Sequence, residues 1–157
     1  MADKIVKIGT LEPKGGNMKK GIMYLTILVF GSVVWGTAYA DVLLIAHKSV
    51  PEKVLSEKEV RQIFMRKKMK WADNSVIKPA VLEDTEIHDA FLEQHVGRSR
   101  SKWRAYWKKM VFTGRGLPPK TFESQKELVR YVAETPGAVG YINSRTSHKN
   151  VTVISVK

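Results

Sequence analysis

The chain has 157 residues, of which 27 are Lys or Arg and 15 are Asp or Glu, so its formal net charge is +12. It contains no cysteine, which excludes a disulfide-stabilised fold, a thiolate metal site and a cysteine nucleophile. The positive charge favours anionic partners or surfaces without identifying one.

An uncharged stretch of 20 residues follows two lysines and ends at Ala40. A basic start, an apolar segment and small residues at the end are the parts of a secretory signal peptide. Ala38 and Ala40 hold the positions that signal peptidase reads, so we predict a signal peptide at 18–40 and a periplasmic mature chain that begins at Asp41. The alternative is an uncleaved membrane anchor, because about 20 apolar residues suffice to cross a bilayer.

Residues 1–17 precede the basic region with which a signal peptide normally begins, and Met18 is a better first residue. The Lys-Gly-Gly run at 14–16 can be encoded by a purine-rich ribosome-binding sequence. We therefore hypothesise that 1–17 is a leader misread as protein, which the nucleotide sequence tests. The remaining 41–157 are 117 residues, enough for one domain, with 22 basic and 13 acidic side chains.

This mature part alternates short apolar or β-branched runs with helical periods, as α/β domains do. Val42–Ala46 is continuously apolar and predicts a strand that is covered on both faces. Val76–Leu82 predicts a second strand, and Pro79 inside it favours an edge position or a bulge, because proline has no N–H to donate. Two further strands are expected at Ala138–Ile142 and Val151–Val156.

Four helices are expected between these strands. Two begin at capping boxes, in which a serine caps the backbone and a glutamate three residues later reaches back. Glycines at 97 and 114 end the two middle helices. The predicted starts are Ser56, Asp84 or Thr85, Ser99 or Ser101, and Ser124. The side chains expected to face the core recur at helical spacing. They are Val60, Ile63, Phe64, Ile87, Ala90, Phe91, Trp103, Tyr106, Trp107, Met110, Val111, Leu128, Tyr131 and Val132.

Two segments carry a resemblance to a known family. Residues 59–64, Glu-Val-Arg-Gln-Ile-Phe, followed by Lys68, Trp71 and Asp73, resemble a segment of phosphate-type periplasmic substrate-binding proteins. Residues 131–142, which include Pro-Gly-Ala-Val-Gly-Tyr-Ile, resemble a later segment of the same family. The two segments fall in the family's order, and the resemblance covers essentially the whole mature chain.

The resemblance implies an α/β fold that is a single lobe of a type 2 periplasmic-binding fold, with a mixed, mostly parallel sheet and about four helices. Full-length relatives have two lobes that close on the ligand, whereas this chain matches the crossover strand and the second lobe. Their phosphate-binding run after the second strand is replaced here by Glu83-Asp84-Thr85-Glu86, whose carboxylates repel an anion. No functional residue of the family is therefore carried over intact.

Two places remain candidates for a ligand. Thr85 lies at a helix start, where free N–H groups suit an anion. In the loop that follows the third helix, glycines let backbone N–H groups converge and an arginine adds a bidentate donor. The alternative for this loop is a glycine helix stop followed by a turn. The candidate ligand-binding residues are Thr85, Thr113, Gly114, Arg115 and Gly116.

Other residues suggest chemistry but fit simpler roles better. Trp71, Trp103 and Trp107 have the rings to stack on a ligand, yet their spacing favours packing in the core. The four histidines lack metal-ligand spacing, and we expect them to be solvated or packed in the core. No nucleophile elbow or triad spacing occurs, so we predict neither enzymatic activity nor a cofactor or metal.

Arg100, Arg104 and Lys108 recur every four residues and form a basic stripe. Such stripes are usually solvated, and the export signal and the lack of a nucleic-acid motif argue against nucleic acid as a partner.

The sequence thus predicts an exported, non-catalytic domain related to the substrate-binding components of phosphate ABC transporters. It would bind phosphate or another oxyanion with a Kd no tighter than about 1 mM. The alternative is an envelope protein-interaction module that derives from the same fold and has no small-molecule ligand. A protein partner or a second copy of the chain would then supply the missing lobe, and a membrane would be contacted only through an uncleaved signal segment.

Overall fold

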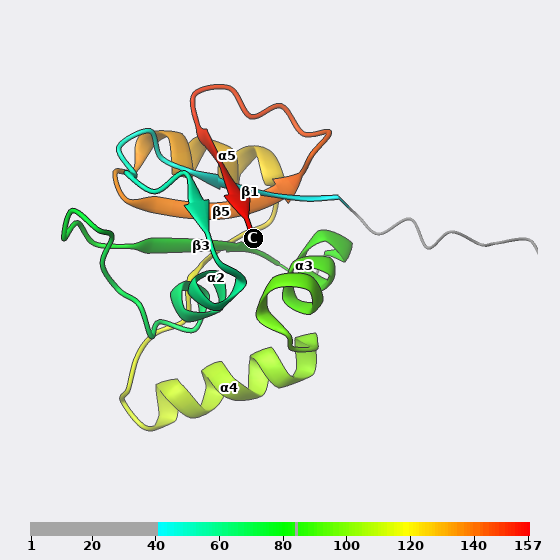
Figure 1. Ribbon diagram of the computed structural model, residues 1–157. Helices are drawn as coiled ribbons and strands as arrows, with labels where there is room; N and C mark the ends of the chain where they lie inside the picture. Colours follow the sequence, from blue (N-terminus) through cyan, green and yellow to red (C-terminus); the bar gives the residue numbers. More distant parts are fainter. Residues whose placement is uncertain (1–40, 84) are drawn as a thin grey trace, which may run out of the picture. The chain divides into compact units, whose positions relative to one another are not determined.

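The computed structural model describes residues 41–83 and 85–157. The leader, signal peptide and cleavage site expected within 1–40 lie outside the described residues. The strands are β1 (Val42–Ala46), β2 (Val54–Leu55), β3 (Lys78–Leu82), β4 (Lys120–Phe122), β5 (Ala138–Asn143) and β6 (Thr152–Val156). The helices are α2 (Glu57–Phe64), α3 (Glu86–Phe91), the π-helical turn η1 (Leu92–Val96), α4 (Arg100–Phe112) and α5 (Gln125–Glu134), as Figure 1 shows.

All six strands form one sheet in the order β2-β6-β1-β5-β3-β4. Strand β1 runs antiparallel to both β5 and β6, whereas β3 runs parallel to β4 and β5, and β2 runs parallel to β6. The sheet is therefore mixed and mostly parallel, and the prediction of an α/β fold with four helices is confirmed. The short strands β2 and β4 were not predicted, because two or three residues carry no detectable alternation.

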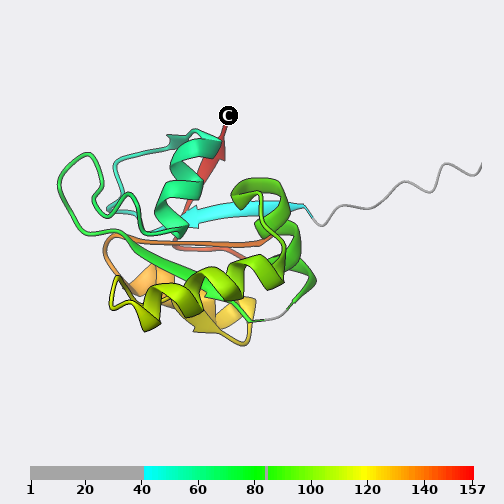
Figure 2. The ribbon, with the colours of Figure 1, turned by 90° about the horizontal axis from the view of Figure 1, so that it is seen from below.

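Helices cover both faces of the sheet. Figure 2 shows α5 on one side and α2 with α3 on the other, and Figure 1 shows α4 below α2 and α3. Successive residues of β5 serve the two faces, as the pleat requires. The ring of Tyr141 stacks on Phe91 of α3 with 3.8 Å between centroids. At Gly140, an added Cβ would lie 2.7 Å from the Leu128 side chain of α5, so glycine permits the close approach of this helix.

The core holds nearly all the side chains predicted for it. Nine of the predicted helical core residues are buried: Val60, Ile63, Phe64, Ile87, Phe91, Trp103, Trp107, Leu128 and Val132. Four are partly buried: Ala90, Tyr106, Met110 and Tyr131. Trp71 is also buried, so the expectation that the three tryptophans pack in the core is confirmed. The prediction was wrong for Val111, which is 47% exposed near the end of α4.

Of the two alternatives predicted from Pro79, an edge position or a bulge, the edge position was wrong, because β3 lies between β5 and β4. The β3–β4 pairing begins only at Ala80, one residue after the proline. Lys78 donates its N–H to Gly137 on the β5 side, and alternation turns the next backbone nitrogen toward the β4 side. Pro79 therefore removes a donor where β4 has not yet begun.

The helix starts agree with the sequence in position. At Ser56 the capping box is complete, with bonds of 3.3 Å and 3.0 Å between the serine and Glu59. At Ser124 only the serine half forms, through a 3.3 Å bond from the Glu127 N–H. Within the described residues, none of the helices combines the length and hydropathy that crossing a bilayer needs.

Candidate functional site

The loop after α4 is a helix stop. Gly114 has a φ of +65°, and the N–H groups of Thr113, Gly114 and Arg115 all donate to carbonyl oxygens in the last turns of α4, at 2.9–3.0 Å. The Thr113 hydroxyl also donates to the Lys109 carbonyl, at 2.8 Å. These bonds form the Schellman arrangement that ends many helices. The three N–H groups are thus engaged with the helix and do not converge on an anion.

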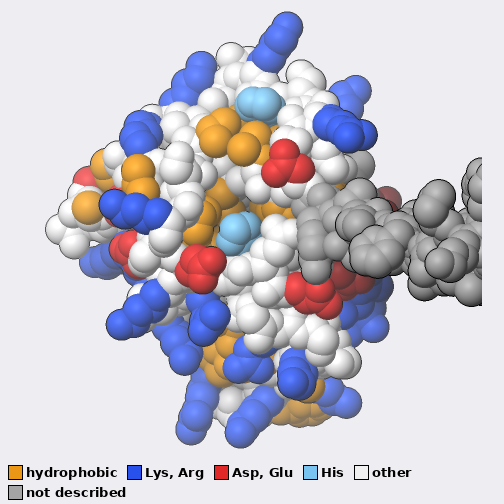
Figure 3. All heavy atoms as spheres, turned by 45° about the vertical axis from the view of Figure 1, so that its right-hand side comes forward, with side chains coloured by type: hydrophobic (Ala, Val, Ile, Leu, Met, Phe, Trp, Pro, Cys, Tyr) orange, Lys and Arg blue, Asp and Glu red, His pale blue; other side chains and the backbone are white. Residues whose placement is uncertain are grey.

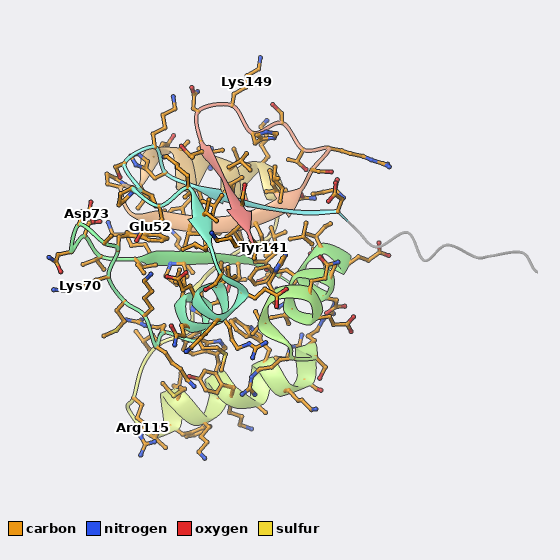
Figure 4. All side chains as sticks on the ribbon, viewed as in Figure 1. Glu52, Lys70, Asp73, Arg115, Tyr141 and Lys149 are labelled. Atoms are coloured by element: carbon orange, nitrogen blue, oxygen red, sulfur yellow. The ribbon has the colours of Figure 1, made fainter. Side chains whose placement is uncertain are left out.

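Thr85 precedes α3 and lies beside the first residue of α4, at the opposite end of α4 from the loop. Its hydroxyl caps α3 by accepting the His88 N–H at 3.2 Å, and its carbonyl accepts a bond of 3.4 Å from Arg100, the first residue of α4. A helix of 13 residues is about 20 Å long. The structure therefore does not bring Thr85 and the loop at 113–116 together. In Figure 4, Arg115 lies on the turn beyond α4, away from Tyr141.

A hollow of about 300 Å³ lies where β3 and β4 end, beside α3 and α4. In open α/β sheets, ligands bind at the carboxyl ends of the strands. The residues that line it come from these four elements and from the turn after β3: Val81, Leu82, Glu83, His88, Trp103, Arg104 and Thr121. We treat this hollow as the candidate functional site.

A chain of hydrogen bonds fixes the histidine of the hollow. The Leu82 N–H donates to the Tyr141 hydroxyl at 3.1 Å, and that hydroxyl lies 2.5 Å from His88 Nδ1. Tyr141 is fully buried, so its proton needs an acceptor, and Nδ1 is the acceptor present. This network assigns the tautomer: Nδ1 accepts, and the proton of the imidazole is on Nε2.

Burial keeps this pair neutral. It lowers the pKa of His88 to about 4, because an imidazolium would be poorly solvated there. The same cause raises the pKa of the Tyr141 hydroxyl above its ordinary value. His88 is only 4% exposed, and within residues 41–83 and 85–157 no group bonds its Nε2. The imidazole is therefore a fixed, neutral N–H donor on the wall of the hollow.

Charged groups of both signs surround this donor. Arg104 and Glu83 both line the hollow. Arg100 makes a two-pronged ion pair with Asp89, with bonds of 2.7 Å and 2.5 Å, and so ties α4 to α3 beside the histidine. The Trp103 ring packs edge-to-face against the imidazole, with 6.1 Å between the ring centroids. The arrangement offers hydrogen-bond donors, one apolar wall and a carboxylate at the rim.

The groups around the hollow are hydrogen-bond donors and a carboxylate, which can bind a ligand. In the described part of the chain, no cluster of three His, Asp or Glu side chains is placed to hold a metal. Thr121 and Glu83 also line the hollow, and Nδ1 of His88 is already bonded to Tyr141.

Sequence reasoning had placed His88 only among solvated or core histidines. A signal was nevertheless present, because His88 shares a helical face with the apolar residues Phe91 and Leu92. A polar side chain on a buried face needs a partner, and here that partner is Tyr141, 53 residues away. No local pattern identifies a partner so distant in sequence.

No protein-family model and no curated protein matches this chain. Solved structures do match. A phosphate ABC transporter substrate-binding protein from Clostridium perfringens, solved with bound phosphate, has 21% identity and a TM-score of 0.60 over 74% of this chain and 44% of its own. An ABC-type phosphate transport receptor from Vibrio cholerae has 15% identity and a TM-score of 0.59, with 46% of its chain covered. PstS from Borrelia burgdorferi has 11% identity and a TM-score of 0.58, with 47% covered.

The chain thus spans less than half the length of these receptors. At such identities the similarity concerns the fold alone. The resemblance expected from residues 59–64 and 131–142 is confirmed at that level, and the fold of this chain matches about one lobe of phosphate ABC transporter substrate-binding proteins.

Proposed function

We propose that residues 41–157 form an exported, non-catalytic binding domain that holds a small oxyanion weakly in the hollow between β3, β4, α3 and α4. The observation that carries the proposal is the His88 Nε2–H, a donor on the wall of the hollow that is fixed by Tyr141 and bonded to no described protein group. A donor held in this way can bond an acceptor oxygen of a ligand in the hollow. The fold of phosphate receptors supports the choice of an oxyanion.

The affinity should be low for two reasons. One lobe leaves the anion half solvated, where charge-assisted hydrogen bonds lose much of their strength. Glu83 lines the hollow and opposes a negative ligand. We therefore expect a Kd for phosphate no tighter than about 1 mM, which corresponds to roughly 4 kcal/mol.

Histidine-labelled protein tests the site directly. Phosphate and sulfate, titrated separately, should move the ring-nitrogen resonances of His88 and leave those of His47, His95 and His148 unchanged. His88→Phe keeps the ring's bulk and removes the donor, so the rise in unfolding temperature that phosphate gives the wild-type protein should be lost. Arg115→Ala is the matched control and should bind as before, because the loop at 113–116 ends a helix. Micromolar phosphate binding that is lost in Arg115→Ala would instead make that loop the receptor site.

Export belongs to the same proposal. The mature protein should begin at Asp41 and be recovered from the periplasm after the signal peptide is removed. Mass spectrometry of protein purified from its native cells measures the first residue. An intact segment at 21–40 in the membrane fraction would favour the anchored alternative.

A protein-interaction module is the second candidate, and an apolar groove favours it. The groove measures about 550 Å³, and its apolar lining includes Ile63, Met69 and Val76. Met69 and Val76 are 56% and 58% exposed, which is high for such side chains. If this module is the function, anions leave the unfolding temperature unchanged, and a partner protein or a second copy raises it.

A further inference from the structure

The positive charge of the domain is concentrated on one side. Two segments, 60–72 and 97–122, contain five and eight Lys or Arg residues and no Asp or Glu. The rest of 41–157 contains nine basic and thirteen acidic residues, so it is slightly acidic. The segments adjoin, because Tyr106 donates to the Met65 carbonyl at 2.9 Å and Arg66 donates to the Leu117 carbonyl at 3.3 Å. In Figure 3, Lys and Arg side chains crowd the lower part of the face, on the side of α4.

Apolar side chains protrude from the same side, at the end of α4. Phe112 is 79% exposed, Leu117 is 67% exposed and Val111 is 47% exposed. The ammonium group of Lys108 lies over the Phe112 ring, 5.9 Å from its centroid. The loop folds back on the helix through the bond from the Arg115 N–H to the Met110 carbonyl. We name this surface the basic tip, defined as Lys108, Lys109, Val111, Phe112, Arg115 and Leu117.

We propose that the basic tip docks on an anionic phospholipid bilayer. Lysine and arginine side chains at an anionic surface gain electrostatic attraction, and exposed aromatic and aliphatic side chains gain by entering the interface beside them. The basic tip combines both kinds of group, and its segment contains no carboxylate that the lipid phosphates would repel. Lys108 shows the matching geometry, with its head group above the ring that would enter the interface.

The bilayer fits this surface better than the other polyanions do. Nucleic acid is bound by basic side chains with aromatic rings that stack on bases, and the exposed Val111 and Leu117 have no role in such a contact. An acidic protein is the remaining occupant, and the experiment below separates it from lipid. The hollow at His88 is lined by Trp103 and Arg104 of α4, and Phe112 of the basic tip lies about 12 Å farther along the helix.

Vesicle sedimentation with residues 41–157, which contain the whole described core, tests the proposal. Vesicles of phosphatidylglycerol and phosphatidylcholine should bind the protein, salt should weaken the binding, and phosphatidylcholine alone should bind little. The double variant Lys108→Glu/Lys109→Glu should lower partitioning by more than about tenfold, since each cation near the surface matters. Lys126→Glu/Arg130→Glu makes the same charge change on exposed α5 residues and should have a small effect. Equal losses in both double variants would overturn the proposal, because net charge alone would then explain binding.

A second measurement concerns insertion. The chain contains no cysteine, so Phe112→Cys carries an environment-sensitive dye at a single place. The emission maximum of the dye should shift to the blue with anionic vesicles only, and Phe112→Ser should weaken the partitioning of the protein onto vesicles. An unchanged dye spectrum with full binding would overturn docking through the apolar side chains. Binding to polyglutamate that requires Phe112, without binding to vesicles, would replace the bilayer by an acidic protein. Circular dichroism establishes that every variant is folded.

Discussion

The two ends of α4 differ although one apolar stripe runs along the whole helix. At the first end, Trp103 and Trp107 are buried, and Trp103 meets the His88 ring. At the second end, Val111 and Phe112 are exposed. The first end packs on α3, whereas the second lies at the opposite end of the helix, away from α3 (Figure 1). Periodicity therefore tells which side of a helix is apolar, and only the neighbouring elements decide how far along that side is covered.

Hydrogen bonding also differs between the two ends of α4. The first end adjoins a buried network in which Leu82, Tyr141 and His88 satisfy one another. The second end is held by local bonds from its own loop to the last turns of the helix. Substitutions at the first end should therefore affect stability, and substitutions at the second end should affect binding.

The largest expected effect compares two aromatic residues of α4. Trp103→Ala should lower the free energy of unfolding by about 3–5 kcal/mol, because it leaves a cavity against the buried histidine. Phe112→Ala should change it by less than about 0.5 kcal/mol, since the ring is 79% exposed. Urea unfolding of both variants measures the difference. Similar losses in the two variants would mean that the end of α4 is covered in solution.

The pH dependence of stability tests the burial of His88 at the first end of α4. Burial lowers the pKa of His88 from its usual 6.5 to about 4. Between these two pH values the unfolded chain binds a proton at this histidine, whereas the native state does not. The stabilisation is complete above pH 6.5 and is lost as the pH falls toward 4. The free energy of unfolding should decrease by about 2 kcal/mol by pH 5 and about 3 kcal/mol by pH 4.

Unfolding curves between pH 7.5 and 5 measure this loss while carboxylates stay largely ionised. His88→Gln removes the titrating ring and should make the dependence shallower. Some dependence should remain, because burial also lowers the pKa of His95. A His88→Gln variant with the full wild-type slope would show that the imidazole is not buried in its neutral form.

Much of the fold could be predicted because its signals are local. The strand Val42–Ala46 was predicted at its observed bounds from five apolar residues in a row, and Ser56 marked the start of α2 through its reciprocal bonds with Glu59. The π-helical turn at Leu92–Val96 was missed, since one extra residue per turn leaves no mark in the helical spacing.

The candidate site depended on contacts that are remote in sequence. From the sequence, Gly114 fitted a helix stop better than an anion loop, and only the direction of the neighbouring N–H groups separates the two. His88 acquires its role from Tyr141, on a strand 53 residues later. Pro79 was misplaced for a similar reason, because the point at which β4 begins beside it is set by the tertiary structure.

Substitutions in the loop that ends α4 should have a smaller effect on the free energy of unfolding. Gly114→Ala should cost about 1–2 kcal/mol, because its φ of +65° strains any residue with a Cβ. Gly116→Ala should cost nothing, since its φ is not in the left-handed region and an added Cβ would meet Met110 at 3.7 Å, an ordinary contact. Thermal unfolding measures both. A tolerated Gly114→Ala together with a damaging Gly116→Ala would contradict the observed loop geometry.

The smallest expected effect compares two helix starts, α2 in the body of the domain and α4. Ser56→Ala should cost about 1 kcal/mol, because the Ser56 hydroxyl caps the helix by accepting the Glu59 N–H at 3.3 Å. Ser99→Ala should cost only a few tenths of that, since the Ser99 hydroxyl makes no capping bond at α4 and is exposed. The carboxyl group of Glu59 provides an independent measurement of the same cap. Hydrogen bonds from Lys68 and then from Ser56 lower the pKa of its carboxyl to about 2, so Ser56→Ala should raise that pKa toward its usual value. A carbon-detected titration of Glu59 follows the change, and an unaltered pKa with unaltered stability would mean that Ser56 does not hold the start of α2.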